Sequence, residues 1–95
     1  MERAVAPATM TKAPTNEIDV GKMLEEILCS LVDRPEELRL EPVFHAEEVT
    51  FRVQAHSTDV GKLIGKGGQT ARALRIILAA NGMRMKRTFS LDIVK

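Results

Sequence analysis

A cluster of glycines between two apolar helical patterns constrains the fold of this chain more than any other feature. The run Gly65-Lys66-Gly67-Gly68 follows a short apolar segment that ends at Ile64, and it leads directly into a longer helical pattern. Glycine lets the backbone adopt positive φ and approach a phosphate closely. A helix N-terminus presents free N–H groups and a partial positive charge to the same phosphate. The sequence therefore predicts two helices joined by a tight turn suited to an anion.

The segment before this unit predicts one helix and two strands. Asn16 is a good helix N-cap, and apolar residues then recur at spacings of three and four as far as Val32. Arg34-Pro35 should end this helix, because proline disfavours the helical conformation in the residue before it. Alternation predicts strands over 38–44 and 49–56, joined by a short hairpin connection at 46–48. Pro42 marks the first strand as an edge strand or a bulge, since proline cannot donate to a ladder.

The rest of the chain predicts two helices and a final strand. Asp59 is expected to cap a short helix over 60–64, and a longer helix is expected over 69–80, closed by Asn81-Gly82 as a C-cap. Alternation over 89–94 predicts the last strand. The apolar residues expected on the inner side of the longer helix are Ala71, Leu74, Ile77 and Leu78. Phe44, Phe51 and Phe89 fall in strand patterns and are expected in the core.

The predicted elements combine into one α+β domain over residues 16–95. A strand joined to another through a helix pair can lie parallel to it by a right-handed crossover. With the hairpin, this gives a small three-stranded mixed sheet with helices packed on one face. Residues 1–15 contain Pro7 and Pro14 without periodicity, and we expect them to form a disordered N-terminal tail.

The composition favours a cytoplasmic protein. A single cysteine, Cys29, cannot form an internal disulfide, and its place in an apolar helical pattern suggests a small buried hydrophobe. No apolar run approaches the ~20 residues of a membrane span. The N-terminus has no continuous apolar stretch of the kind found in secretory signals.

The charge of the chain is divided sharply between its two halves. Residues 1–59 carry six basic and twelve acidic side chains, whereas residues 60–95 carry eight basic side chains and one acidic, Asp92. The overall charge of +1 hides this asymmetry. A basic half that also contains the glycine cluster favours a polyanion as its partner.

The spacing of the glycines excludes the common nucleotide-binding loops. A P-loop needs four residues between its glycines and a Ser or Thr after its lysine, but only three residues separate Gly61 from Gly65, and Gly67 follows Lys66. A GxGxxG fingerprint fails because no third glycine stands at the required spacing. A simple interhelical turn remains an alternative, although one glycine would suffice for it.

The stretch Ile64-Gly65-Lys66-Gly67-Gly68 resembles the I-G-x-x-G core of a KH domain, whose GxxG loop clamps the backbone of about four nucleotides. The predicted order helix-strand-strand-helix-helix-strand resembles the bacterial, type II KH topology. Within that family, Asp59 to Arg75 is similar to the D-x-G-K-x-I-G-K-x-G-x-x-x-x-A-L-R stretch of the small single-KH proteins called KhpA. The resemblance covers residues 17–95.

The resemblance implies single-stranded RNA as the ligand. No cofactor is expected, and no Cys/His/Asp cluster has the spacing of a metal site. It also implies a homodimer, a heterodimer with a KH protein of the Jag/KhpB type, or both, with links to cell elongation and division. The residues expected to contact RNA are Lys62, Ile64, Gly65, Lys66, Gly67, Gly68, Arg72 and Arg75. In this interpretation Ile64 forms part of the apolar floor beneath the bases, although Leu63 could take that place instead.

Two departures from the family pattern and two alternatives remain. Gln69 stands where many relatives carry a basic residue, and Gly67 makes the loop more flexible, so ordering it on RNA costs more entropy.

His45 and His56 are expected to be surface residues rather than metal ligands, and no nucleophile–base pattern suggests an enzyme. The main alternative function is a protein–protein adaptor that keeps the KH fold; DNA is an alternative ligand.

Overall fold

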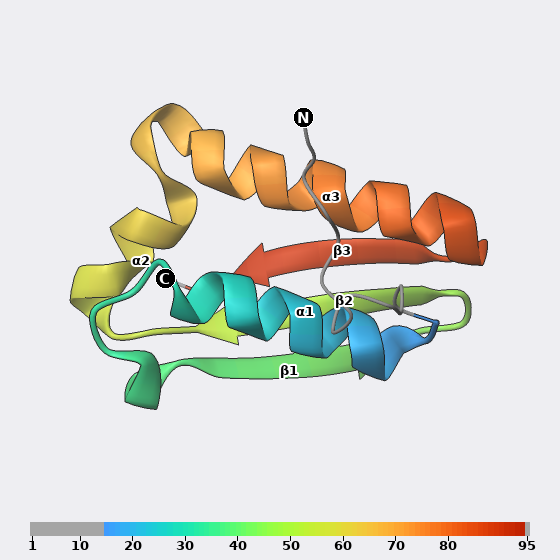
Figure 1. Cartoon of the computed structure of the whole chain (residues 1–95), viewed down its shortest axis with the longest axis horizontal. Helices are drawn as coiled ribbons and strands as arrows, with labels where there is room; N and C mark the ends of the chain where they lie inside the picture. The colour runs from blue at the N-terminus through green and yellow to red at the C-terminus, as the bar shows by residue number, and fades with distance from the viewer. Residues whose placement is uncertain (1–14, 95) are drawn as a thin grey trace, which may run out of the picture.

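The computed structural model describes residues 15–94, which form three α-helices, two short 3-10 turns and one sheet. In chain order the elements are α1 (Glu17–Cys29), η2 (Pro35–Glu37), β1 (Arg39–Phe44), β2 (Glu48–Gln54), α2 (Ser57–Ile64), η3 (Lys66–Gly68), α3 (Gln69–Met85) and β3 (Thr88–Ile93). The predicted order of helices and strands is therefore confirmed (Figure 1). Apart from Thr15, the tail predicted for residues 1–15 lies outside the described residues.

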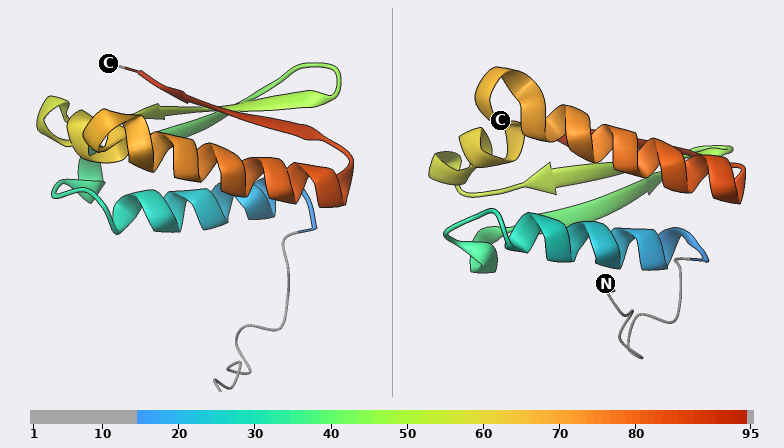
Figure 2. Two further views of the ribbon diagram at one scale, coloured as in Figure 1. Left: turned by 90° about the horizontal axis from the view of Figure 1, so that it is seen from above. Right: turned by 45° about the horizontal axis from the view of Figure 1, so that its top comes forward.

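The sheet has the predicted mixed topology, with β2 in the centre. β1 pairs antiparallel with β2, and β3 pairs parallel with β2. Figure 2 shows α1 and α3 side by side on one face of this sheet, while no helix of the described chain covers the other face. This is the architecture of a type II KH domain. None of the described helices has the length and apolar character needed to cross a membrane.

The core lies between the sheet and the two long helices. Phe51 from β2 and Phe89 from β3 are buried, with ring centroids 5.7 Å apart. Phe44 is 60% exposed, so its predicted place in the core is wrong. It is the last residue of the edge strand β1, where a second strand neighbour is lacking. The buried apolar residues that pack into one contiguous core are Val20, Leu24, Leu28, Leu38, Val49, Phe51, Val53, Leu63, Leu74, Leu78, Phe89 and Leu91.

Pro42 occupies the edge strand, as its missing N–H requires. The N–H of His45 donates to the carbonyl of Glu48 over 2.8 Å, which closes the hairpin. Since backbone groups alternate along a strand, Pro42 faces the open edge of the sheet and removes no ladder bond. This hairpin also confirms the predicted short connection between the first two strands.

Helix α1 begins as predicted, but it ends at Cys29, before the end that was predicted at Arg34-Pro35. The side chain of Asn16 accepts a hydrogen bond from the N–H of Asp19 over 2.9 Å, which confirms the N-cap. The helix stops at Cys29, where the hydroxyl of Ser30 donates to the carbonyl of Ile27 over 2.6 Å. Cys29 is half-buried and packs against the core, in agreement with its interpretation as a small hydrophobe.

Helix α3 is longer than the sequence predicted. It continues through Asn81 and Gly82 to Met85, so the predicted C-cap at Gly82 is wrong. The actual cap is Lys86, in the left-handed conformation with φ 58°, and the N–H of Arg87 donates back to the carbonyl of Gly82 over 2.9 Å. Gly82 is buried there, and a Cβ on it would collide with the carbonyl oxygen of Arg87. Gly82 permits close packing inside the helix and does not end it.

The inner face of α3 is also narrower than predicted. Ala71, Leu74 and Leu78 are buried, but the Ile77 side chain is 40% exposed. Ile76 and Met83 are more exposed still. The outer face of α3 therefore carries apolar side chains that no part of the described chain covers.

Candidate nucleic-acid interface

The Gly65–Gly68 turn connects α2 to α3 at one end of the domain, where the two helices meet (Figure 1). Gly65 ends α2 with φ 81° and ψ 169°, and its N–H donates to the carbonyl of Gly61 over 2.8 Å. Gly67 and Gly68 follow with φ 62° and 77°. All three glycines of the turn therefore have positive φ, so the turn geometry itself favours glycine at each of them.

The three glycines differ in what surrounds them. A Cβ on Gly65 would collide with the side chain of Thr70, and one on Gly68 would lie 3.3 Å from a guanidinium nitrogen of Arg72. A Cβ on Gly67 would meet no atom within 4 Å. Gly65 is thus required by the packing of the turn, whereas Gly67 borders open space in which a ligand backbone can approach.

A small cavity lies directly beside the turn, between the first half of α3 and the end of β3. It has a volume of about 260 Å³ and is lined by Ile64, Gly68, Ala71, Arg72, Arg75 and Ile93. Two guanidinium groups thus border an apolar floor. Of the predicted contact residues, the structure brings together four here: Ile64, Gly68, Arg72 and Arg75.

Both arginines are oriented by bonds to backbone carbonyls. Nη1 of Arg72 donates to the carbonyl of Gly67 over 2.8 Å, which ties the side chain to the turn. Nη2 of Arg75 donates to the carbonyl of Leu91 in β3 over 3.3 Å. A guanidinium carries five N–H donors, so each arginine keeps donors for a phosphate. Lys66 is exposed at the tip of the turn.

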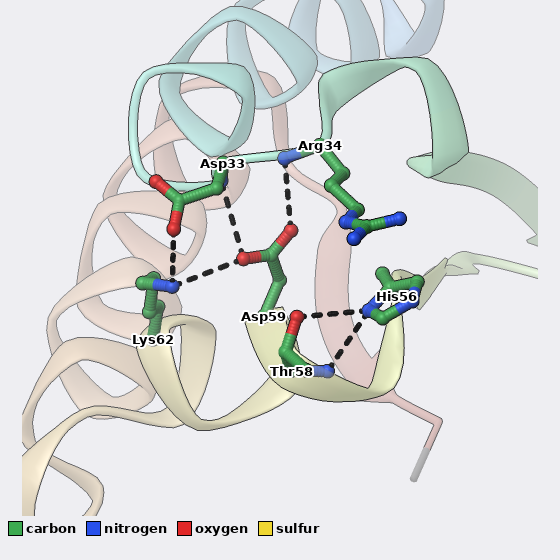
Figure 3. Close-up of polar contacts among 6 residues, drawn as sticks. All are labelled: Asp33, Arg34, His56, Thr58, Asp59 and Lys62. Atoms are coloured by element: carbon green, nitrogen blue, oxygen red, sulfur yellow. Dashed lines mark hydrogen bonds and ion pairs between the residues drawn. The ribbon is translucent and has the colours of Figure 1, made fainter.

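Lys62 has a different setting from the other predicted contact residues. Its Nζ lies 2.8 Å from Oδ2 of Asp33 and 3.2 Å from Oδ1 of Asp59 (Figure 3). Hydrogen bonds first to Asp33 and then to Asp59 raise the pKa of the Lys62 ammonium above its ordinary value. Lys62 therefore lies in an internal ion-pair network, one turn of α2 before the glycines.

Asp59 is the centre of this network and is completely buried. Oδ1 and Oδ2 accept the backbone N–H groups of Asp33 and Arg34 over 3.2 and 3.0 Å (Figure 3). Burial alone would raise the pKa of the Asp59 carboxyl, but these two backbone donors and then Lys62 outweigh it and hold the pKa below its ordinary value. The carboxylate fastens the loop after α1 to helix α2.

The predicted role of Asp59 as an N-cap is therefore wrong. The cap of α2 is His56, whose Nδ1 accepts the N–H of Thr58 over 3.2 Å. Asp59 lies inside the first turn of the helix, with its side chain directed at another part of the chain. Its partners stand about 25 positions earlier in the sequence, so no local pattern indicates them.

Comparisons with known proteins agree with this fold. A family model described as the KH domain of KhpA/KhpB matches residues 21–93. The RNA-binding protein KhpA of Halalkalibacterium halodurans is 36% identical over 72 residues, covering 76% of this chain and 95% of that protein. KhpA of Chlamydia pneumoniae is 35% identical over 74 residues, covering 78% and 95%. KhpA of Mycobacterium leprae is 38% identical over 69 residues, covering 73% and 86%.

Proposed function

Because this chain belongs to the KhpA/KhpB KH-domain family, we propose that it binds single-stranded RNA at the Gly65–Gly68 turn. The observation that carries this proposal is the junction of the turn with the cavity lined by Arg72 and Arg75. The turn offers the open space at Gly67 to a sugar-phosphate chain. A GxxG loop in this position clamps about four nucleotides in KH domains generally.

The side chains around the turn have distinct roles in this proposal. Lys66, Arg72 and Arg75 supply positive charge to the phosphates, two of them from fixed positions on α3. Ile64 is half-buried and forms part of the apolar floor under the bases, while Leu63 is buried in the core. Lys62 can contact a phosphate only by giving up a carboxylate partner, so we assign it the smallest share of the affinity.

The direct test is RNA binding by wild type and by a Gly67→Asp, Gly68→Asp double variant. Aspartate tolerates positive φ better than most residues, so the variant should fold. We expect fluorescence anisotropy with single-stranded RNA to show at least about a 100-fold loss of affinity, because two carboxylates would face the phosphates. Wild-type affinity should also fall steeply with salt. Equal binding by the two folded proteins would contradict the proposal, and competition with single-stranded DNA tests the choice of nucleic acid.

We further infer that the protein acts as a homodimer through the outer face of α3. Ala73, Ile76, Ile77 and Ala80 are all exposed and follow one another at helical spacing. A second copy would cover this stripe with an identical one, small residues facing large ones. A typical stable interface buries roughly 800 Å² of accessible surface per partner, and a contact through one helix face buries less, so the dimer should be weak. Two linked RNA sites would still gain avidity.

An Ile76→Glu variant tests the dimer. Ile76 is 69% exposed, so glutamate should leave the fold intact. In sedimentation experiments we expect the wild type to be a dimer and the Ile76→Glu variant to be a monomer. The matched control is Ile18→Glu on α1, where isoleucine is 68% exposed. A monomeric wild type would refute the homodimer and leave a KH protein of the KhpB type as the candidate for this face.

The setting that we infer is post-transcriptional regulation in the cytoplasm, where a weak RNA clamp gains affinity by pairing. The adaptor alternative makes an opposite forecast in the same experiments. A tight assembly whose affinity changes neither on addition of RNA nor in the Gly67→Asp, Gly68→Asp variant would favour the adaptor.

A further inference from the structure

A second cavity lies at the opposite end of α3, about 360 Å³ in volume. The apolar side chains Ala79, Met83 and Phe89 line it, together with the cations Lys86 and Arg87 and the carboxylate Glu47. An apolar floor beside two cations is chemistry suited to a nucleotide, whose base is apolar on its faces and whose phosphate is anionic. This cavity shares no lining residue with the cavity beside the Gly65–Gly68 turn.

The two cavities lie on the same flank of α3. Positions 72, 75, 79, 83 and 86 follow one another at spacings of three and four, so they fall in one row along the helix. The first two line the cavity at the turn, and the last three line the distant cavity. Figure 1 shows β3 running beside α3 from one end to the other. At 1.5 Å per residue, positions 75 and 86 are about 17 Å apart along the helix.

Lys86 carries an unusual backbone conformation for its residue type. It is the one non-glycine residue with positive φ in the described part of the chain, at φ 58°. Glycine commonly fills this position at the end of a helix because it has no Cβ to strain. Strained backbone of this kind gathers at ligand sites, where the side chain is needed. The Lys86 side chain is exposed and borders the cavity.

The cations here also have a structural explanation, which applies to Arg87 more than to Lys86. Arg87 forms an ion pair with Glu17 of α1, and positive charge near a helix C-terminus is favourable in itself. A cation anywhere in the last turn of the helix would stabilise the C-terminus equally well. This effect therefore does not explain why lysine occupies a position that favours glycine. The Lys86 ammonium is therefore the group most available to a ligand.

We propose that the cavity at Lys86 is a second nucleotide subsite, which extends the RNA path from the Gly65–Gly68 turn along the α3–β3 flank. This inference rests on the proposed function, because the first nucleotides are held at the turn. Lys86 contacts a phosphate, and Met83 and Phe89 support the base of that nucleotide. An RNA that spans both cavities should bind more tightly than one that fills the turn alone.

The experiment compares oligouridylates of about 5 and about 12 nucleotides, one filling the turn and one long enough for both cavities. Lys86→Gln removes the charge at nearly constant length, and Lys22→Gln on α1 is the matched control. We expect Lys86→Gln to weaken the longer RNA about fivefold and to lower its salt slope by about 0.7, while the shorter RNA and the control are unchanged. A Lys86→Gly variant should weaken the longer RNA equally yet raise Tm, because glycine relieves the positive φ.

Three outcomes separate this inference from the function on which it rests. Selective loss with the longer RNA supports the subsite. If neither Lys86 variant changes either RNA while Gly67→Asp, Gly68→Asp abolishes binding, the subsite is overturned and the clamp at the turn stands. If wild type binds neither RNA, both are overturned.

Discussion

An Asp59→Asn variant should lose about 10 to 20 °C in Tm, although it changes only one oxygen to nitrogen. The wild-type carboxylate accepts the N–H groups of Asp33 and Arg34 in a completely buried setting. An asparagine would place its NH₂ group against one of these two donors, which leaves buried donors unpaired. It would also leave Lys62 with Asp33 as its one remaining carboxylate partner. Thermal unfolding followed by circular dichroism measures the difference.

The matched control lies in the same network. Asp33→Asn removes the carboxylate that is 2.8 Å from Lys62, but this side chain is 78% exposed. Exposed ion pairs contribute little to stability, so we expect a change of no more than about 3 °C. Similar losses in the two variants would show that the Lys62 ion pairs, rather than the backbone donors on Asp59, fasten the loop to α2.

The direction of the Asp59 pKa shift adds a pH dependence. Its pKa in the folded protein is lowered from the ordinary 3.8, so the unfolded chain takes up a proton at higher pH than the folded protein does. This stabilisation is complete above about pH 5 and is lost as the pH falls through 3.8 and then through the lower folded value. Asp59→Asn has no such proton to bind, so the gap in Tm between wild type and variant should narrow in acid.

The fold and the turn could be predicted because their signals are local. Period-two and period-3.6 patterns indicated every helix and strand, and the glycines stood between two of them. What could not be predicted depends on packing between distant segments. A glycine in the sequence does not show whether it ends a helix or, like Gly82, leaves room for the carbonyl of Arg87. Phe44 fits the alternating pattern of a strand, but it lies on the open edge of the sheet and is exposed.

The charged residues show the same limit more clearly. In the sequence Lys62 and Lys66 look equivalent, because both are lysines beside the glycine cluster. Lys62 stands shortly before Gly65, and Lys66 stands between Gly65 and Gly67. The structure separates them, because Lys62 bonds to two carboxylates while Lys66 is exposed at the tip of the turn. One of those carboxylates comes from the loop after α1, which no spacing within 59–75 reveals. Pairing of this kind decides which cation is available to RNA.

Gly65→Ala and Gly67→Ala should separate the glycine that the fold needs from the glycine that the ligand needs. Gly65→Ala combines φ 81° and ψ 169° with a Cβ in collision with Thr70, so we expect a loss of about 3 kcal/mol in the free energy of unfolding. Gly67 has φ 62° and ψ 19°, near the left-handed region that alanine can enter, and its Cβ would meet no atom. We expect about 1 kcal/mol there. Urea unfolding measures both values.

RNA binding by the same two variants completes the argument. The methyl group of Gly67→Ala would occupy the open space that we assign to the sugar-phosphate chain, so a stable variant should bind RNA at least about tenfold more weakly. Gly65→Ala should lose binding only in proportion to the distortion or unfolding of the turn. If Gly67→Ala binds RNA as wild type does, the phosphate chain passes elsewhere, because no atom of the protein itself excludes that methyl group.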